Sequence, residues 1–589
     1  MKRNKLWKRI AVVLLAGCTV MGCLTGCGNT AAETQVKDSA VSESSENVES
    51  SLTEEVKESE EVIPEVADLT YWCAILNSAT LLNDLGEMPM MQEAMEKNYV
   101  NIEFFHPSTN LTEAFNLKLS SGDFEDIVEY KWSSYAGGPA QAIADGVIID
   151  LAPYIEEGLA PNFKKVLDEN PEIAKQVTTD EGQIFCFPAI GEKSVNVTSG
   201  YYFRQDMLEK VNMEAPTTID EWEAVLTAFK DELGVEKPLS GTAANFIGTS
   251  SWIAGAFDTY SGYYVRDGKV QYGFLDESYK DYIATINKWY EAGIIDAEIF
   301  GNDSSIVNSN LLNDRSAVGF GYIGSAIGTL TNSAAETNPD FKLVGVQYPV
   351  LEKGDEPKFI NRSWDVRTDH AAAITTACEN VEAAIRFLDF WYSEEGSLMK
   401  NFGTEGVSYE MIDGYPTYTD LILKNPDGYS ISDALGGYTR AANPSVGLID
   451  VRYYEQYYQL EEQVEAMYTW NEYADNAISV LMPSVTPTSD ESEELAVIEN
   501  AVKTYVEEEL TKFIMGLRNM EEWDSFIETV KGMNVERAIE IRQGAYDRYM
   551  ARQFVGLRVS LDTLNFYKYV LKRLGVRYEK VVKIKKGYI

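Results

Sequence analysis

The stretch LTYWCAIL at residues 69–76 has the continuous apolar character of a buried strand. It is followed by two strand-like segments, YVNIEFF at 99–105 and DIVEYK at 126–131. Between the three strands, residues 89–97 and 111–119 place apolar side chains at helical spacing. A β-α-β-α-β order favours a mostly parallel sheet covered by helices, so the sequence predicts an α/β fold.

Four notable side chains lie where these predicted strands end. Trp72, Asn77, His106 and Trp132 are at, or just after, the strand ends. Ligands of parallel sheets bind outside the carboxyl ends of the strands. We therefore expect a binding site along this edge.

The alternation of strands and helices continues toward the C-terminus. The spacing T-x-x-E at residues 218–221 and 488–491 is that of a capping box at the start of a helix. Residues 319–323 (GFGYI) and 342–348 (KLVGVQY) are typical of further strands. No period of about 20–50 residues recurs, which argues against a solenoid.

Composition limits the class of protein. The 589 residues fit two large lobes or about three domains. The formal net charge is −43, which argues against a nucleic-acid-binding protein, because such surfaces are basic. Only two histidines occur, His106 and His370, so a multi-histidine metal site is excluded. We predict no metal ion and no cofactor.

The N-terminus has the pattern of a secretory signal. Residues 1–9 (MKRNKLWKR) carry five positive charges, and an apolar stretch follows. The sequence LTGC that ends at Cys27 resembles a bacterial lipobox, in which cleavage precedes a lipidated cysteine. Residues 1–26 are therefore predicted to be a lipoprotein signal peptide and Cys27 the lipidation site, with Cys18 as the alternative.

Two segments have the composition of regions outside a packed body. Residues 28–66 contain eleven acidic residues, seven serines and no aromatic residue, so we interpret residues 27–66 as a disordered acidic tether. From residue 552 to the end, ten Lys or Arg face two acids, so residues 553–589 form a basic extension of unassigned role. Signal, lipid and tether predict a protein on the extracellular face of the cytoplasmic membrane.

The common enzyme signatures G-x-S-x-G, H-E-x-x-H and the P-loop do not occur. A G-x-G-x-x-G begins at Gly319, but a poor strand precedes it, which argues against a dinucleotide site. His370 beside Asp369 fits a surface histidine better than a catalytic relay. We predict no catalytic residues and no enzyme activity. A glycoside hydrolase needs only two carboxylates about 5–10 Å apart, so a carbohydrate-active enzyme is the alternative.

Four segments carry a family resemblance. The most specific is AAIRFLDFWYSEEGSLMKNFGTEGVSYE at residues 383–410. The others are SGDFEDIVEYKW at 121–132, TTIDEWEAVLTAFK at 217–230 and EIRQGAYDRYMAR at 540–552. From about residue 69 to residue 552, the chain resembles extracellular solute-binding proteins of family 1. These are carbohydrate-binding proteins of ABC importers, and the resemblance is closest to the LipO-like lipoproteins of Gram-positive bacteria.

The resemblance implies a two-lobed periplasmic-binding-protein-like fold of type II, with mixed or parallel sheets flanked by helices and a hinge between the lobes. The first lobe would comprise residues 67–195 and 315–400. The second would comprise residues 196–314 and 401–552, with the C-terminal helices. The implied function is that of a monomeric, lipid-anchored protein that binds an oligosaccharide between the lobes. It would deliver this ligand to the transmembrane permease subunits of an ABC importer.

Aromatic side chains can be matched to such a ligand on physical grounds. A pyranose has an apolar C–H face that an aromatic ring covers and a hydroxyl rim that polar groups bind. Trp132, Trp252 and Trp364 are flanked by Ser, Gly or charged residues, which is atypical of a core tryptophan. Trp72, which lies near the end of the first predicted strand, is a fourth candidate. Tryptophans in helix-like segments are predicted to be core instead: Trp222, Trp289, Trp391 and Trp523.

Polar candidates come from the same segments. Asn77 follows the first strand, and Tyr130 lies near the end of the third. Tyr322 lies in GFGYIG, whose glycines let the backbone approach a ligand closely. The remaining candidates surround Trp364 and are charged: Arg362, Asp365 and Arg367.

Overall fold

The computed structural model describes residues 64–108, 110–191, 195–441 and 445–552. Contacts divide the chain into Met1–Ile63 and Pro64–Ile589, and every described residue belongs to the second unit. The predicted signal peptide, Cys27, most of the tether and the basic extension lie outside the described residues. No helix of the described segments is long and apolar enough to cross a membrane.

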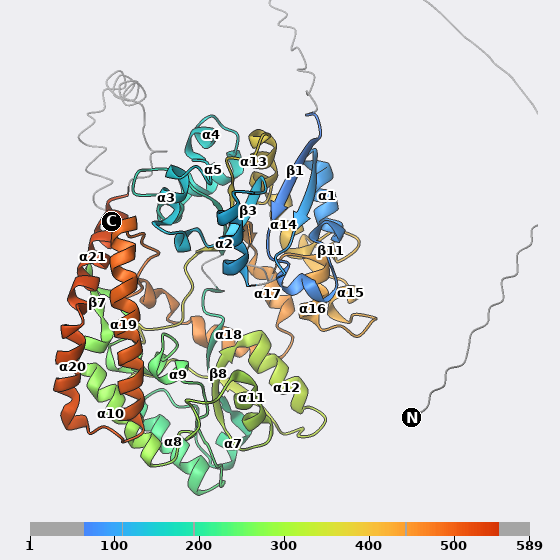
Figure 1. Ribbon diagram of the computed structural model, residues 1–589. Helices are drawn as coiled ribbons and strands as arrows, with labels where there is room; N and C mark the ends of the chain where they lie inside the picture. The colour runs from blue at the N-terminus through green and yellow to red at the C-terminus, as the bar shows by residue number, and fades with distance from the viewer. Residues whose placement is uncertain (1–63, 109, 192–194, 442–444, 553–589) are drawn as a thin grey trace, which may run out of the picture. The chain divides into compact units, whose positions relative to one another are not determined.

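The buried apolar side chains of the described residues form two large clusters. One cluster draws on residues 69–190 and 366–399 together with Val446, and we call the elements around it the first lobe. The other draws on residues 189–360 and 402–541, and we call the elements around it the second lobe. In Figure 1 the blue strands of the first lobe lie apart from the green helices of the second.

A mixed six-stranded sheet forms the centre of the first lobe. Its strands are β1 (Ala67–Trp72), β2 (Val100–Phe105), β3 (Ile127–Tyr130), β4 (Phe187–Gly191), β10 (Val366–Ile374) and β13 (Gly447–Ile449). Their order is β13-β4-β10-β3-β1-β2. β1 runs parallel to β2 and β3, whereas β10 is antiparallel to β3 and β4. The predicted β-α-β-α-β start is confirmed, with small shifts at the strand ends.

Short helices cover this sheet. They are α1 (Pro89–Lys97), α2 (Leu111–Ser121), α3 (Gly138–Ala144), α4 (Ala152–Glu156), α5 (Pro161–Glu169), α6 (Pro171–Val177), α13 (Val381–Phe390) and α14 (Glu394–Phe402). Single turns of helix also occur at η1 (Leu76–Thr80), η2 (Leu85–Glu87) and η3 (Trp132–Ser134). Asn110 caps α2 by accepting a hydrogen bond from the Thr112 amide, so the helix begins at Leu111, where the predicted apolar stripe also begins.

A three-stranded sheet, β8-β5-β9, supports the second lobe. β5 (Ser199–Arg204) pairs antiparallel with β8 (Val318–Tyr322) and β9 (Leu343–Gly345). Around it lie α7 (Gln205–Lys210), α8 (Ile219–Asp231), α9 (Ala244–Ile247), α10 (Glu277–Glu291), α11 (Ser304–Leu312), η7 (Ile323–Gly328) and α12 (Thr329–Ala334). Two further elements follow α9: the turn η5 (Trp252–Phe257) and the hairpin of β6 (Tyr263–Arg266) and β7 (Lys269–Tyr272). The predicted capping box is confirmed, because Thr218 accepts from the Glu221 amide at the start of α8.

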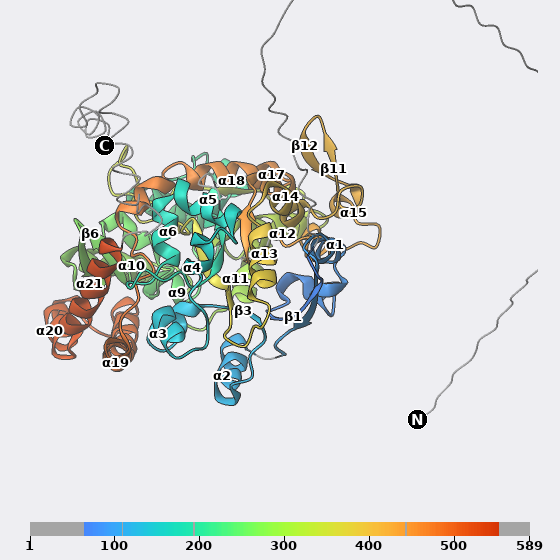
Figure 2. The same ribbon diagram turned by 90° about the horizontal axis from the view of Figure 1, so that it is seen from above.

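The last part of the described chain is mostly helical. A hairpin of β11 (Tyr409–Ile412) and β12 (Tyr415–Tyr418) precedes α15 (Asp420–Leu423), α16 (Ile431–Tyr438), α17 (Val451–Tyr457) and α18 (Glu461–Asn471). The C-terminal helices are α19 (Ser489–Ile514), α20 (Trp523–Gly532) and α21 (Val535–Ala551), which lie side by side in Figures 1 and 2. α19 begins with the predicted capping box at Thr488 and Glu491.

Two of the chain segments that pass between the lobes are hydrogen-bonded to each other. One leads from β4 to β5, and the other leads into β10. The Gly191 amide donates to the Asp365 carbonyl (2.7 Å), and the Ser363 amide donates to the Asn196 carbonyl (2.8 Å). Because these segments lie side by side between the two clusters, they are the natural place for a change of angle between the lobes.

The predicted lobe boundary at residue 315 needs correction. Buried residues from Ala317 to Ile360 belong to the second cluster rather than the first. The reason is strand pairing, since β8 and β9 hydrogen-bond to β5 and so remain in the second lobe. The chain returns to the first cluster only at Val366, where β10 begins.

Candidate functional site

Several strand-like segments of the second lobe end at one edge. Leu239 forms parallel bridges with Ile295 and with Val318. The residues that follow these three positions therefore lie at the same carboxyl edge, as the hydrogen bond from Ser240 Oγ to Asp296 Oδ2 (3.1 Å) shows. Ligands of α/β proteins bind outside such an edge, which makes this region the first place to look for a site.

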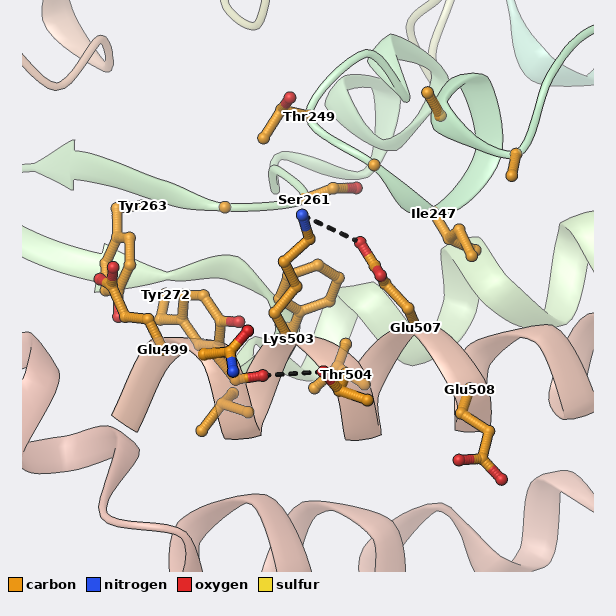
Figure 3. A pocket seen from close by; sticks show the side chains of 18 of the residues that line it. Ile247, Thr249, Ser261, Tyr263, Tyr272, Glu499, Lys503, Thr504, Glu507 and Glu508 are labelled. Carbon is orange, nitrogen blue, oxygen red and sulfur yellow. Dashed lines mark hydrogen bonds and ion pairs between the residues drawn. The ribbon is translucent and has the colours of Figure 1, made fainter. Parts of the chain in front are cut away.

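A cavity of about 1050 Å³ is lined by residues of the segment 243–249, which follows Leu239, and by two further parts of the second lobe. Its walls are α9 with the residues around it, the β6–β7 hairpin, and one face of α19 (Figure 3). The side chains that matter most for the chemistry of the lining are Thr249, Ser261, Tyr263, Tyr272, Asn500 and Lys503. Segments more than 200 residues apart in the sequence thus form one surface.

Aromatic rings form one side of the cavity. The rings of Tyr263 and Tyr272 are 4.7 Å apart between centroids, and that of Tyr272 is 5.1 Å from Phe274. Burial, reinforced by the nearby Glu499 carboxylate, raises the pKa of Tyr263 far above its ordinary value. Its hydroxyl therefore stays protonated at neutral pH and can both donate and accept a hydrogen bond.

The facing wall is the polar side of α19. Lys503 extends from the helix toward the loop that carries Ser261, and its ammonium lies 3.8 Å from the Glu507 carboxylate (Figure 3). Both groups are reachable from solvent, with 72% of the Lys503 and 45% of the Glu507 side chain exposed. Thr504 Oγ1 donates to the backbone carbonyl of Asn500, one turn earlier in α19 (2.9 Å), and the exposed side chain of Asn500 also lines the cavity.

An ion pair joins these two walls. Arg542 of α21 donates through Nε to Glu499 of α19 (2.6 Å) and lies over the Tyr263 ring, 4.3 Å from its centroid. Burial works to lower the pKa of Arg542, but the hydrogen bond to Glu499 and the attraction of its charge, with a smaller contribution from Tyr263, together hold the pKa above its ordinary value. The pair thus fixes α21, α19 and the hairpin as one polar and aromatic surface.

Trp252 lies close to this cavity but is buried, contrary to the expectation from its neighbours. Only 6% of it is exposed, and it packs on Tyr260 (5.3 Å) and Tyr348 (6.2 Å). Its Nε1 has no hydrogen-bond partner among the described residues, although it is buried. It lines a small space of about 20 Å³ that shares Tyr263 with the large cavity, so it lies behind the aromatic wall.

The candidates at the carboxyl edge of the first lobe are part of its core. Trp132 is fully buried, donates from Nε1 to the Ala371 carbonyl (3.1 Å), and meets Phe115 edge-on. Tyr130 stacks on the same phenylalanine at 3.7 Å, and Trp72 is 3% exposed. The neighbours of Trp132 are atypical of a core tryptophan, but the indole is nevertheless part of the core. Asn77 lies in η1, and its side chain is outside what the structure describes.

The remaining candidates gather at the two connecting segments. Arg362 is buried and donates to Asp365 (3.0 Å), which also accepts from Asn196 Nδ2 (2.8 Å). Trp364 is half-buried, and Arg367 has a buried Nε without a described partner. Tyr322 is 60% exposed at the end of β8, where it pairs with Ser199, the residue at which the first connecting segment enters β5. The structure thus brings five of the ten candidates to the junction between the lobes.

Other reactive side chains of the described residues have structural settings. His106 contacts the Cys73 carbonyl through Nδ1 (2.8 Å) and accepts from the Leu85 amide (3.2 Å). The cysteines at 73, 186 and 378 are free and buried. Within the described segments, no three His, Cys, Asp or Glu side chains are placed to hold a metal ion. The groups available for binding are thus those of the cavity lining, which provides hydroxyl, amide, aromatic and paired charged groups. Such groups suit reversible binding of a polar ligand.

Sequence comparison finds a relative of similar length. The fructooligosaccharide ABC transporter substrate-binding protein FusA of Streptococcus pneumoniae serotype 4 is 24% identical over 494 residues, which cover 80% of this chain and 88% of FusA. Lipoprotein LipO of Bacillus subtilis strain 168 is 22% identical over 330 residues, which cover 54% of this chain and 63% of LipO.

Structure comparison supports the same conclusion about the fold. The crystal structure of the alginate-binding protein AlgQ2 without calcium matches with a TM-score of 0.63 at 24% identity, covering 82% of this chain and 99% of that one. Such neighbours are periplasmic-binding proteins of type II, so the predicted fold class is confirmed. They are binding proteins rather than enzymes. Residues 82–397 match the family described as bacterial extracellular solute-binding protein, and the chain therefore belongs to that family.

Proposed function

We propose that this protein is the substrate-binding component of an ABC importer and that it captures an oligosaccharide outside the cell. The observation that carries the proposal is the cavity at the carboxyl edge of the second lobe, in a chain of the solute-binding family. The name of the relative FusA, which matches over four-fifths of this chain, supports both the importer and the type of ligand.

The size and lining of the cavity suit a sugar of more than one unit. Pockets for drug-sized ligands span about 300–1,000 Å³, and this cavity, at about 1050 Å³, is slightly larger than that range. Tyr263 and Tyr272 offer aromatic surface for C–H faces, while Thr249, Asn500 and Lys503 can bind hydroxyl groups. This combination of one apolar and one hydrogen-bonding wall is what a pyranose or furanose requires.

Capture is proposed to involve closure of the first lobe over the ligand. The segments hydrogen-bonded through Gly191 and Asp365 would act as the hinge, because they connect the two clusters. Tyr322 and Trp364, which are partly exposed at this junction, are proposed to contact the ligand after closure. Arg362, Asp365 and Arg367 are proposed to hold the hinge, and the residues at the ends of β1 and β3 support the first lobe from within.

The proposed location follows from the N-terminus. A lipid on Cys27 would anchor the chain to the cytoplasmic membrane, and residues 28–66 would span the distance to the folded body. The relative LipO is itself named a lipoprotein. A monomer held in this way would deliver its ligand to the permease subunits while staying attached to the cell surface.

The proposal is tested by a thermal-shift screen of the chain from residue 28 onward against neutral and acidic oligosaccharides of two to six units. A true ligand at one hundred times its dissociation constant stabilises the folded protein by about 2.7 kcal/mol, which raises the melting temperature. Chromatography of the sugar afterwards should return it unshortened. If no oligosaccharide shifts the melting temperature, the proposal is wrong. Shortened products would instead favour the carbohydrate-active enzyme.

A further inference from the structure

The cavity lining holds two cationic side chains, and a carboxylate lies beside each of them. Arg542 donates to Glu499 at 2.6 Å, and Lys503 lies 3.8 Å from Glu507. These are the cations among the described lining residues. A fifth charged side chain, Glu508, points away from Lys503 in Figure 3 and pairs with Lys512 at 2.8 Å. The lining therefore offers no cation that lacks a negative partner.

The element that forms the polar wall is itself strongly acidic. α19 carries eight carboxylates, at positions 490, 491, 493, 494, 499, 507, 508 and 509, against the two lysines 503 and 512. Its side toward the cavity adds only uncharged donors and acceptors, from Asn500, Thr504 and Thr511. The whole chain has a formal net charge of −43, so the field around the cavity does not favour an anion.

We infer that the cavity selects uncharged oligosaccharides and rejects oligouronates, with the Glu507–Lys503 and Glu499–Arg542 pairs as the specificity-determining groups. This inference rests on the proposed function and adds the charge class of the ligand to it. A sugar hydroxyl can donate to Glu507 and accept from Lys503 at the same time, so a neutral ligand uses both partners of the pair. A uronate carboxylate can accept hydrogen bonds only from the cation. It would then lie against the protein carboxylate that already neutralises that cation.

The magnitude of the discrimination follows from like-charge repulsion. Bringing a ligand carboxylate next to Glu507 or Glu499 opposes binding at every uronate unit that enters the lining. We expect neutral oligosaccharides to bind at least about tenfold more tightly than uronates of equal length at low ionic strength. Salt screens this repulsion, so uronate binding should strengthen from 20 to about 150 mM NaCl while neutral binding stays constant.

Calorimetric titration of the chain from residue 28 onward tests the inference with named probes. The neutral probes are nystose, maltotetraose, xylotetraose and mannotetraose, and the acidic probes are tetragalacturonate and tetramannuronate. Binding confined to neutral probes, or at least about tenfold tighter for them, is the expected result. Uronate binding as tight as the best neutral probe would overturn the inference and leave the proposed function intact. Absence of binding by all six probes would overturn both.

A variant then locates the selection. Glu507→Gln removes one carboxylate and frees Lys503, so tetragalacturonate should bind at least about tenfold more tightly than to the natural protein, with neutral binding reduced only slightly. Glu493→Gln is the matched control, because it makes the same change on an exposed part of α19 outside the lining. Circular dichroism confirms that both variants fold. If Glu507→Gln leaves uronate affinity unchanged, or if the control raises it equally, the assignment of Glu507 is wrong.

Discussion

The carboxyl ends of the strands have different surroundings in the two lobes. In the first lobe, the aromatic side chains after β3 turn inward, and Trp132 is fully buried between Phe115 and the Ala371 carbonyl. In the second lobe, the segment after Leu239 borders a cavity of about 1050 Å³, whose charged groups reach solvent. We call the edge of the first lobe the closed edge, because side chains of its own core fill it. We call the edge of the second lobe the open edge, because it borders the cavity.

The same contrast holds for the ion pairs near each edge. Glu129 of β3 and Arg440 are 0% and 4% exposed, with a shortest separation of 3.2 Å, and Tyr71 also donates to Glu129 (2.7 Å). At the cavity, by contrast, 72% of the Lys503 side chain and 45% of the Glu507 side chain are exposed. A charge sealed in a core has no partner except the one the fold provides, whereas an exposed charge can exchange its partner for water or a ligand. Burial therefore separates groups that stabilise the fold from groups that can bind.

The largest expected effect comes from the closed edge. Trp132→Ala should lower the free energy of unfolding by about 3–5 kcal/mol, because it empties a fully packed site and removes a hydrogen bond to Ala371. Urea unfolding measures this change, with Trp132→Phe as the smaller control that keeps most of the volume. An unchanged unfolding midpoint for Trp132→Ala, combined with loss of sugar binding, would reverse our comparison and make Trp132 a ligand contact.

The second largest effect concerns the buried ion pair. Arg440→Ala should cost about 3 kcal/mol of stability, because Glu129 keeps its burial and loses its positive partner. The matched control is Arg440→Met combined with Glu129→Gln, which removes both charges at once and should recover most of the loss. Chemical denaturation of the two proteins gives both values. If the double variant is no more stable than the single one, uncompensated charge is not the cause.

Regular elements of this fold could be predicted from sequence because their signals are local. The strands near residues 69, 99 and 126, and the capping boxes of α8 and α19, depend on spacings within a few residues. Helical spacing also identified core tryptophans correctly: Trp222, Trp289, Trp391 and Trp523 are all buried.

The setting of the loop tryptophans could not be predicted in the same way. Trp132 opens the short turn η3, where Lys131 and Ser134 are exposed while the indole points into the core. The neighbours in sequence therefore indicate that the turn is exposed, but they do not indicate whether the indole ring is buried. The cavity was missed because Tyr263 and Glu499 are more than 200 residues apart, and only the packing of α19 on the hairpin brings them together. The polar residues 500, 503 and 507 on one side of α19 were the available signal.

A smaller effect is expected at low pH, at a carboxylate of the second lobe that lies outside the cavity lining. The hydrogen bond from Lys353, followed by that from the Thr217 amide, lowers the pKa of Glu221 to about 2. A lowered pKa stabilises the fold above the unfolded-state value of about 4.3, and this contribution is lost as the pH falls toward 2. Because a third of the side chain is exposed, we expect a loss of about 1 kcal/mol, typical of a capping residue.

Thermal unfolding between pH 6 and pH 2.5 measures this contribution. Glu221→Gln should be less stable than the natural protein at pH 6 and nearly equal to it at pH 2.5. Ligand-induced stabilisation at pH 6 should be the same in both proteins, because Glu221 does not line the cavity. A stability difference that stays constant with pH would show that the lost contribution is not ionic.

The smallest effect on stability is expected at the open edge, and it is the one that distinguishes a binding group from a structural one. Lys503→Ala removes an exposed cation whose described partner is Glu507, so the free energy of unfolding should change by less than about 0.5 kcal/mol. The stabilisation gained from a bound oligosaccharide should nevertheless fall by about 1 kcal/mol or more, since a charged hydrogen-bond donor is lost. Lys531→Ala on α20 is the control, because Lys531 and its partner Glu528 both lie outside the lining. Equal ligand-induced shifts in the natural protein and in Lys503→Ala would move the binding surface away from α19, toward Tyr322 and Trp364 at the junction.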